Sequence, residues 1–175
     1  FRTFGHFDVA LLNGGLPKWL DEDRAVESAV SNPEPGRFTP CFNPNLVKSR
    51  DQVIANLEEG LELVVDARAP LRFAGSEAEP RPTEKTGHIP GSVNLPFARL
   101  MDMENNAVMR PADVLASAFE EAGIDMKKPV IASCGSGVTA GVIAFSLHLL
   151  GQSNFSVYDG SWAEWGNHPE TPVSQ

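Results

Sequence analysis

The hydrophobic pattern predicts four helices between residues 49 and 175. The first has Ser49 as its N-cap, because Ser49 and Gln52 match the capping-box pattern, and Gly60 ends it. In the second helix the apolar residues recur three and four positions apart, which is typical of a half-buried helix. The four predicted helices are 49–60, 111–123, 139–150 and a short one from Ser161, capped by Ser161 and Glu164.

Short apolar runs between these helices predict strands at 61–65, 93–95, 129–133 and 155–158. Because strands and helices alternate, the predicted fold class is α/β, an open and mostly parallel sheet with helices on both faces. Ligands of such sheets bind at the carboxyl ends of the strands. We therefore expect chemistry in the loops that follow Val65, Ser133 and Tyr158.

The first 48 residues have a different organisation. Residues 11–19 match 157–165, since both have apolar positions, then Asn-Gly or Asp-Gly, then a short helical run that ends in Trp. This repeat predicts a strand and a helix in residues 1–20, as the C-terminal remnant of a preceding domain of the same architecture. Residues 21–48 are rich in proline and predict an extended linker. Residues 49–175 would then form the main domain.

Composition excludes several classes of protein. The formal charge of −9 argues against a nucleic-acid-binding surface and against docking on anionic membranes. No apolar run approaches the roughly 18–20 residues of a membrane span. The two cysteines do not indicate a disulfide-built scaffold, and we assign Cys41 no role. No Cys/His cluster is present, so we expect no metal and no organic cofactor.

Cys134 lies in a glycine-rich loop between a predicted buried strand and a predicted helix. Glycines let successive backbone N–H groups point at one centre, and the start of the helix adds partial positive charge. This setting would stabilise a thiolate, which is the nucleophilic form of cysteine, and also a persulfide anion. The alternative, a buried structural cysteine, does not require glycines at 135 and 137. A reactive thiol also suggests an intracellular location, cytoplasmic or mitochondrial.

Two other anion-binding chemistries are disfavoured. A cysteine phosphatase needs an arginine six residues after its cysteine to bind the phosphoryl oxygens, and that position is Ala140. A nucleotide-binding P-loop needs Gly-Lys-Ser/Thr before the helix, and this sequence is absent.

The loop after the first strand contains three arginines. Arg72 and Arg81 suit a carboxylate substrate, because a guanidinium group can bind both oxygens, but a purely structural role is equally open for each. For Arg68 we favour a structural role, in an ion pair with Asp66 or Glu79. His88 is interpreted as a histidine that holds a turn through hydrogen bonds.

Several of these motifs together resemble the rhodanese family, and the cysteine loop is similar to that of its 3-mercaptopyruvate sulfurtransferases. The sequences that carry the resemblance are Asp66-Ala67-Arg68, Arg72-Phe73, Glu79-Pro80-Arg81, Gly87-His88-Ile89-Pro90-Gly91-Ser92, Cys134-Gly135-Ser136-Gly137-Val138-Thr139-Ala140 and Tyr158-Asp159-Gly160-Ser161-Trp162. The thiosulfate sulfurtransferases of this family typically have Arg-Lys in place of Gly135-Ser136.

The resemblance implies a catalytic rhodanese-like domain over 49–175 and a role for each matched residue. Cys134 would take sulfur from 3-mercaptopyruvate as a persulfide, with Ser136 in a proton relay. Substrate-binding residues would be Arg72, Arg81, Gly135, Gly137, Val138 and Thr139. The sulfur would pass to a thiol such as that of thioredoxin, or to cyanide. In the family a His and an Asp of the N-terminal rhodanese-like domain complete the relay, and that domain is absent from this chain. Thiosulfate as the donor, or a persulfide carrier without turnover of its own, are the alternatives.

Overall fold

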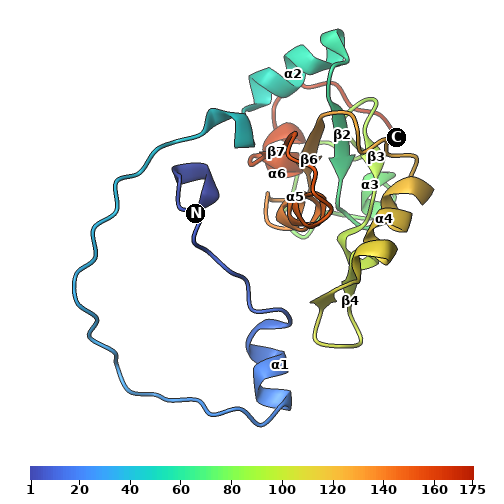
Figure 1. The fold of residues 1–175 in the computed structure, drawn as a ribbon. Coiled ribbons are helices and arrows are strands. Elements are labelled where there is room, and N and C mark those ends of the chain that lie inside the picture. Colours follow the sequence, from blue (N-terminus) through green and yellow to red (C-terminus); the bar gives the residue numbers. More distant parts are fainter.

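A five-stranded parallel sheet lies at the centre of the fold in the computed structural model, which describes residues 1–175 (Figure 1). The strand order is β1-β7-β6-β2-β3, and every neighbouring pair is parallel. A separate antiparallel pair, β4-β5, forms a small hairpin. The strands are β1 Val47–Lys48, β2 Leu63–Asp66, β3 Val93–Asn94, β4 Met101–Asp102, β5 Val108–Met109, β6 Val130–Ser133 and β7 Phe155–Tyr158.

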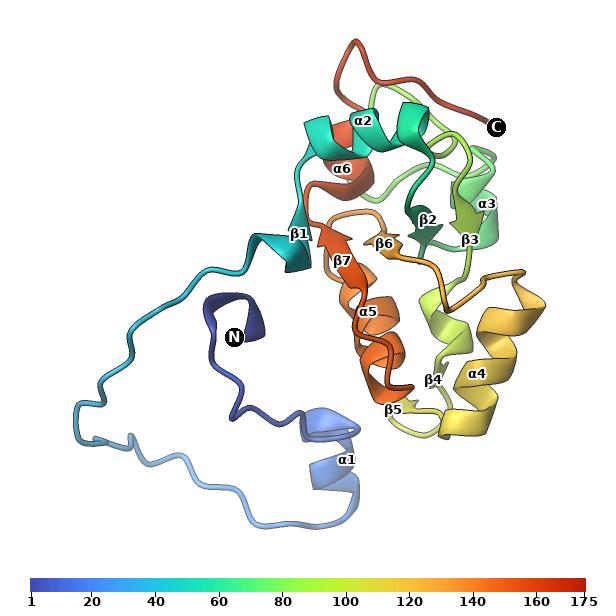
Figure 2. The same ribbon diagram turned by 45° about the horizontal axis from the view of Figure 1, so that its top comes forward.

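Helices cover both faces of this sheet (Figure 2). Alternate residues of the strands point to opposite faces, so Val64 and Ile131 pack in one core cluster, whereas Val65 and Ala132 pack in the other. The first cluster includes residues of α2 and α6, and the second includes residues of α4 and α5. The helices are α1 Gly15–Asp21, α2 Arg50–Glu59, α3 Pro70–Phe73, α4 Ala112–Glu121, α5 Ala140–Leu149 and α6 Ser161–Trp165, with 3-10 turns at Arg2–Phe4, Pro44–Leu46 and Phe97–Arg99. The predicted α/β class is confirmed.

The predicted capping box of α2 is confirmed in both directions. The Ser49 Oγ accepts a hydrogen bond from the Gln52 N–H (3.3 Å), and the Gln52 Oε1 accepts one from the Ser49 N–H (2.8 Å). Gly60 ends the helix in the left-handed conformation. The sequence pattern therefore gives both ends of α2.

The predicted cap of α6 is wrong. Gly160, not Ser161, is the N-cap, and no side chain caps the helix. The Ser161 hydroxyl is used elsewhere: it accepts a hydrogen bond from the Cys134 N–H (3.1 Å) and donates one to the Tyr158 carbonyl (2.8 Å). A tertiary contact has replaced the local one that the Ser161–Glu164 spacing favours.

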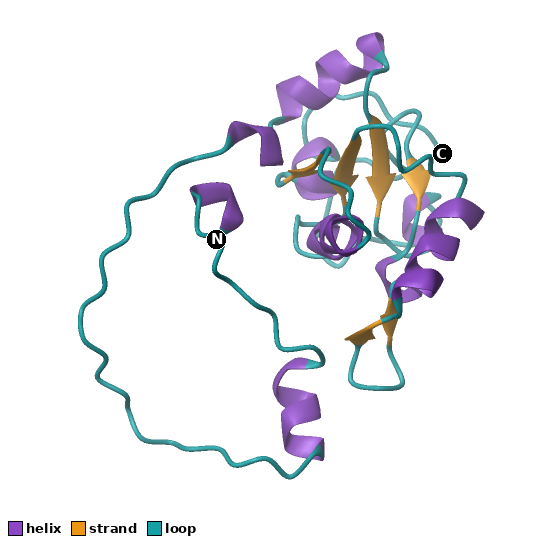
Figure 3. Ribbon diagram, in the orientation of Figure 1, coloured by secondary structure: helices purple, strands orange, loops and turns teal.

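Residues 1–43 lie outside the sheet and its helices (Figure 3). The predicted helix of this segment forms as α1, but the strand predicted before it does not. A strand needs a neighbouring strand for its backbone hydrogen bonds, and residues 8–13 have none. The predicted linker runs without helix or strand from residue 24 to 43. Its predicted end at residue 48 was misplaced, because β1 pairs with β7 within it. No helix of the chain is both long enough and apolar enough to cross a membrane.

Candidate active site

A pocket of about 170 Å³ lies at the carboxyl ends of β2 and β6, the edge of the sheet where the sequence predicted chemistry. Cys134 follows the last residue of β6 directly. The lining residues are Arg72, Glu79, Pro80, Arg81, Thr83, Cys134, Gly135, Ser136, Val138, Thr139 and Ala163. The structure thus brings together all the predicted site residues except Gly137, which does not line the pocket.

The loop after Cys134 presents unpaired hydrogen-bond donors. None of the backbone N–H groups of residues 135–139 donates a hydrogen bond to another group of the chain. The loop leads directly into the N-terminus of α5, where the partial positive charge of the helix adds to these donors. Unpaired N–H groups of this kind bind anions, including an anionic sulfur.

Hydrogen bonds hold the backbone of Cys134, at the start of this loop, in a fixed position. Its N–H donates to the Ser161 Oγ, and its carbonyl accepts a hydrogen bond from the Trp162 N–H (2.9 Å). The Ser161 Oγ lies 3.9 Å from the Cys134 Sγ. The cysteine is 1% exposed, so a reagent reaches its sulfur only through the pocket. Ser161 has a backbone φ of +48°, a conformation that costs energy for any residue except glycine.

A side chain at either glycine of the loop would force a neighbouring group to move. A Cβ on Gly135 would lie 2.6 Å from the Arg72 Nη2, and one on Gly137 would lie 2.6 Å from the Asp159 carbonyl oxygen. Gly137 also has a φ of +84°, which favours glycine. Gly137 therefore shapes the loop, whereas Gly135 allows Arg72 to approach Cys134.

Arg68 has the structural role that the sequence indicated. Its guanidinium group donates to Asp66 and to the Glu79 Oε1 (2.8 Å), and lies 4.5 Å from the centre of the Trp162 ring. Burial acts to lower the pKa of Arg68, but the hydrogen bonds to both carboxylates outweigh it and raise that pKa above its ordinary value. Arg68 remains charged and ties the loop after β2 to the core.

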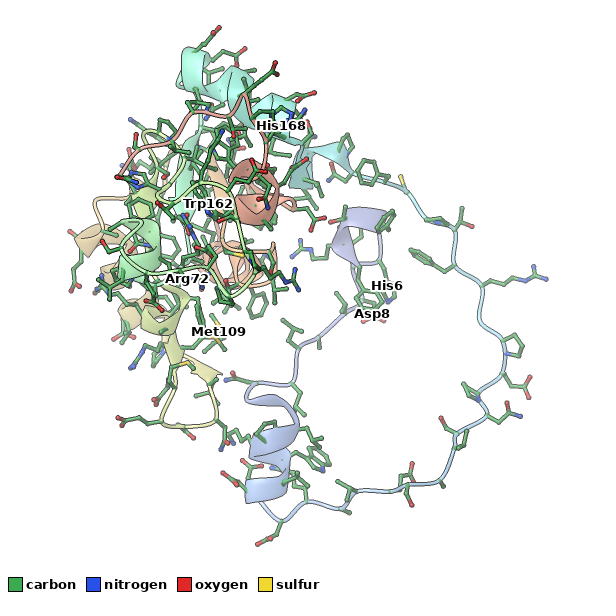
Figure 4. The ribbon with its side chains drawn as sticks, turned by 180° about the vertical axis from the view of Figure 1, so that it is seen from behind. His6, Asp8, Arg72, Met109, Trp162 and His168 are labelled. Atoms are coloured by element: carbon green, nitrogen blue, oxygen red, sulfur yellow. The ribbon has the colours of Figure 1, made fainter.

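Arg72 pairs with another side chain of the chain, whereas Arg81 does not. The Arg72 Nε donates to the Glu79 Oε2 (3.1 Å), and the Arg72 Nη2 forms an ion pair with the same oxygen. Figure 4 shows Arg72 on the same side of the domain as Trp162. Arg81 is exposed and forms no hydrogen bond or ion pair within the chain. Its guanidinium group is therefore available to a ligand, which favours the binding interpretation that the sequence left open.

His88 holds a turn, as predicted. Its ring stacks on Phe73, with centroids 3.9 Å apart, and its Nδ1 lies 3.0 Å from the Phe73 carbonyl oxygen. Its backbone pairs with that of Ser174, so the C-terminal residues close over this loop.

Sequence reasoning missed two parts of the site. Glu79 was considered only as a partner of Arg68, yet it also pairs with Arg72 and lines the pocket. Ser161 was assigned to a helix cap, yet it holds Cys134. The sequence offered one signal for each: an acidic residue between two arginines for Glu79, and a position just after a strand end for Ser161.

Similarities between this chain and known proteins agree with this geometry. A family model described as a rhodanese-like domain matches residues 49–168. The chain belongs to the rhodanese family. It is 41% identical over 94% of its length to 3-mercaptopyruvate sulfurtransferase of Mus musculus, and 42% identical over its whole length to thiosulfate sulfurtransferase of Bos taurus.

A solved rhodanese structure is also similar. SseA of Escherichia coli, described as a 3-mercaptopyruvate sulfotransferase, matches 92% of the chain with a TM-score of 0.78 and 36% identity. The chain spans 55% to 59% of the length of these three relatives. The two sulfurtransferases match this rhodanese chain almost equally well, so overall identity does not discriminate between their donors.

Proposed function

We propose that this rhodanese domain is the sulfur-accepting part of a 3-mercaptopyruvate sulfurtransferase. The supporting observation is that Cys134 borders a pocket with unpaired N–H groups and two arginines, of which Arg81 has no partner in the chain. A small keto acid has one carboxylate for the arginines and one sulfur for the cysteine. Gly135 and Ser136 add no further positive charge, which disfavours the thiosulfate dianion.

The proposed reaction begins with attack of the Cys134 thiolate on the sulfur of 3-mercaptopyruvate. A sulfur–sulfur bond forms, the carbon–sulfur bond breaks, and its electron pair remains on the carbon as the enolate of pyruvate. The arginines hold the carboxylate and the carbonyl, so that they stabilise this enolate and orient the sulfur. A proton, for which the Ser136 hydroxyl in the pocket is the proposed donor, then gives pyruvate. The loop N–H groups stabilise the Cys134 persulfide.

The sulfur then passes to a thiol, such as a thioredoxin or a small thiol, or to cyanide. Attack of the acceptor thiolate on the outer sulfur regenerates the Cys134 thiolate and transfers the persulfide. A reducing compartment, cytoplasmic or mitochondrial, would supply such thiols and keep Cys134 reduced.

We also propose that residues 1–20 close a preceding rhodanese-like domain. The proposal is supported by the greater length of the relatives and by exposed apolar side chains in this segment, which a neighbouring domain would cover. These side chains include Phe1, Phe7, Leu11, Leu12 and Leu16. Adding the preceding domain of a relative should bury them and increase turnover, whereas unchanged turnover would contradict a shared active site.

Intact-protein mass spectrometry tests the function. The chain is mixed with 3-mercaptopyruvate or, separately, with thiosulfate, and Cys134→Ser is the control. A gain of one sulfur with 3-mercaptopyruvate that the control loses is the expected result. A gain only with thiosulfate would assign thiosulfate as the donor. A gain only from a persulfidated partner protein would make this domain a sulfur carrier.

A further inference from the structure

Three charged side chains line the pocket beside Cys134: Arg72, Arg81 and Glu79. Without the Cys134 thiolate, the two guanidinium groups and the carboxylate have a formal net charge of +1. Glu79 is the only acid of the pocket, and the Glu79 side chain is 7% exposed. A buried carboxylate among anion-binding groups opposes the ligand that the arginines attract, so it needs a physical explanation.

The neighbouring charges do not change this count. Arg68 is balanced by Asp66, since both its Nε and its Nη2 donate to that carboxylate and both side chains are almost fully buried. Asp159 lies beside Gly137, but it is exposed and does not line the pocket. Solvent therefore screens the Asp159 charge from an anion in the pocket.

Glu79 is fixed in place by both of its oxygens. The Oε1 accepts from the Arg68 Nη1 (2.8 Å), and the Oε2 accepts from the Arg72 Nε (3.1 Å). The Oε2 also lies 3.5 Å from the position that a Cβ on Gly135 would take, so the carboxylate faces the loop that starts at Cys134. Glu79 cannot turn away when an anion binds without breaking its hydrogen bonds to Arg68 and Arg72.

We propose that Glu79 determines donor specificity by lowering the net charge of the pocket by one. The proposal rests on the proposed function, since it concerns the sulfur donors of the same site. The interaction free energy between two charges scales with their product, so one charge at Glu79 affects a dianion twice as strongly as a monoanion. Glu79 thus disfavours thiosulfate, a dianion, more than 3-mercaptopyruvate, whose carboxylate carries its single charge.

Glu79→Gln in a Cys41→Ser background provides the first test. Glutamine keeps the size of the side chain and can accept a hydrogen bond from Arg68. The rate of Cys134 persulfide formation is measured against concentration for each donor. We expect the ratio of thiosulfate to 3-mercaptopyruvate efficiency to rise about tenfold. Glu77→Gln, at an exposed glutamate without an ion pair, should leave the ratio unchanged. A purely structural role of Glu79 would lower both efficiencies together, and that result would overturn the proposal.

A second readout does not depend on sulfur transfer. Cys134 is alkylated with iodoacetamide, a neutral reagent, and protection by pyruvate (a monoanion) or sulfate (a dianion) gives the affinity for each. Glu79→Gln should increase the affinity for sulfate about tenfold more than the affinity for pyruvate. Equal changes in both affinities would overturn the proposal. If neither donor transfers sulfur to wild-type Cys134, the proposed function fails. The protection measurement would still decide the role of Glu79.

Val138→Lys tests the charge count without disturbing Glu79. The Val138 side chain is 76% exposed and borders the pocket, so lysine adds a positive charge without straining the fold. Relative to Val138→Gln, this variant should shift preference toward sulfate and thiosulfate about threefold, less than Glu79→Gln because solvent screens an exposed charge. No shift relative to Val138→Gln would contradict charge as the basis of selection.

Discussion

At the scale of single residues, the site depends on side chains whose partners are distant in sequence. The patterns at 134–139 and at 66–68 are local, and they identified Cys134 and the ion pair of Arg68 from the sequence. Ser161 and Glu79 act across the fold, so no local pattern reveals which group they contact. Placing them requires the register of β6 with β2 and β7, which sequence spacing does not give.

Arg81→Gln should weaken the use of 3-mercaptopyruvate without lowering stability. Arg81 has no partner within the chain, so its removal leaves no buried group unpaired. Loss of a charge-assisted hydrogen bond to a carboxylate is worth roughly 1.5–3 kcal/mol, or about 10- to 100-fold in kcat/KM. Steady-state kinetics and thermal melting would measure both effects, with Arg37→Gln as the control. Full activity in the Arg81 variant would rule out the proposed carboxylate contact.

Ser161→Ala should destabilise the chain by about 1–3 kcal/mol, because the buried N–H of Cys134 loses its acceptor. Ser161→Gly should be about 1 kcal/mol more stable than Ser161→Ala, because glycine tolerates a positive φ. Urea unfolding of the two variants beside Ser153→Ala, at an exposed serine, measures both differences. If the alanine variant were the more stable of the two, backbone strain at Ser161 would not be the cause.

At the scale of elements, the sequence predicted those whose signals are local. Helices α2, α4 and α5 and strands β2, β6 and β7 lie within a few residues of their predicted positions. Strand β1 and the β4-β5 hairpin were missed, because each strand has two residues and depends on a distant partner or a tight turn. The strand predicted in residues 1–20 fails for the opposite reason, since its apolar pattern has no neighbouring strand.

Tyr158, the last residue of β7, should stay protonated at high pH while the chain is folded. Burial is the main cause that raises the pKa of Tyr158, and its hydrogen bond to Glu164 (2.7 Å) adds to this effect. Because the folded pKa is raised, the resulting stability is complete below the unfolded pKa of about 10 and is lost as pH rises above it. Tyr158 is the only tyrosine, so ultraviolet absorbance at about pH 11 should show tyrosinate in unfolded but not in folded protein. Tyrosinate in the folded chain would contradict this burial.

At the scale of the whole molecule, the chain has one folded domain and an extended N-terminal segment. The sheet, its two core clusters and the pocket all lie in residues 44–175. Few hydrogen bonds join the two parts, among them the Asn106 Nδ2 to the Asp21 Oδ2 (2.7 Å) and the Met109 N–H to the Asn13 side chain (2.8 Å). The rhodanese fold therefore does not depend on the first 43 residues for its core.

Limited proteolysis tests this division. Trypsin should cleave first after Arg24 or Arg37, because both lie in the exposed, extended segment. The fragment that begins at Phe38 should keep the circular dichroism of the sheet and its helices, and melt within a few degrees of the uncut chain. Early cleavage after Arg99 instead would show that the hairpin region opens more readily than the extended segment.

The neighbouring positions of β1 and β7 also set the order in which the domain can fold. The first strand of the sheet pairs only with the last, so the edge of the sheet forms after nearly the whole domain has been gathered. Such non-local pairing slows folding to roughly milliseconds or seconds. Until β7 docks, Ser161 and Trp162 cannot hold Cys134, and its thiol is open to oxidants. The chain therefore gains its protected nucleophile late in folding, and refolding without a reductant should yield inactive, oxidised protein.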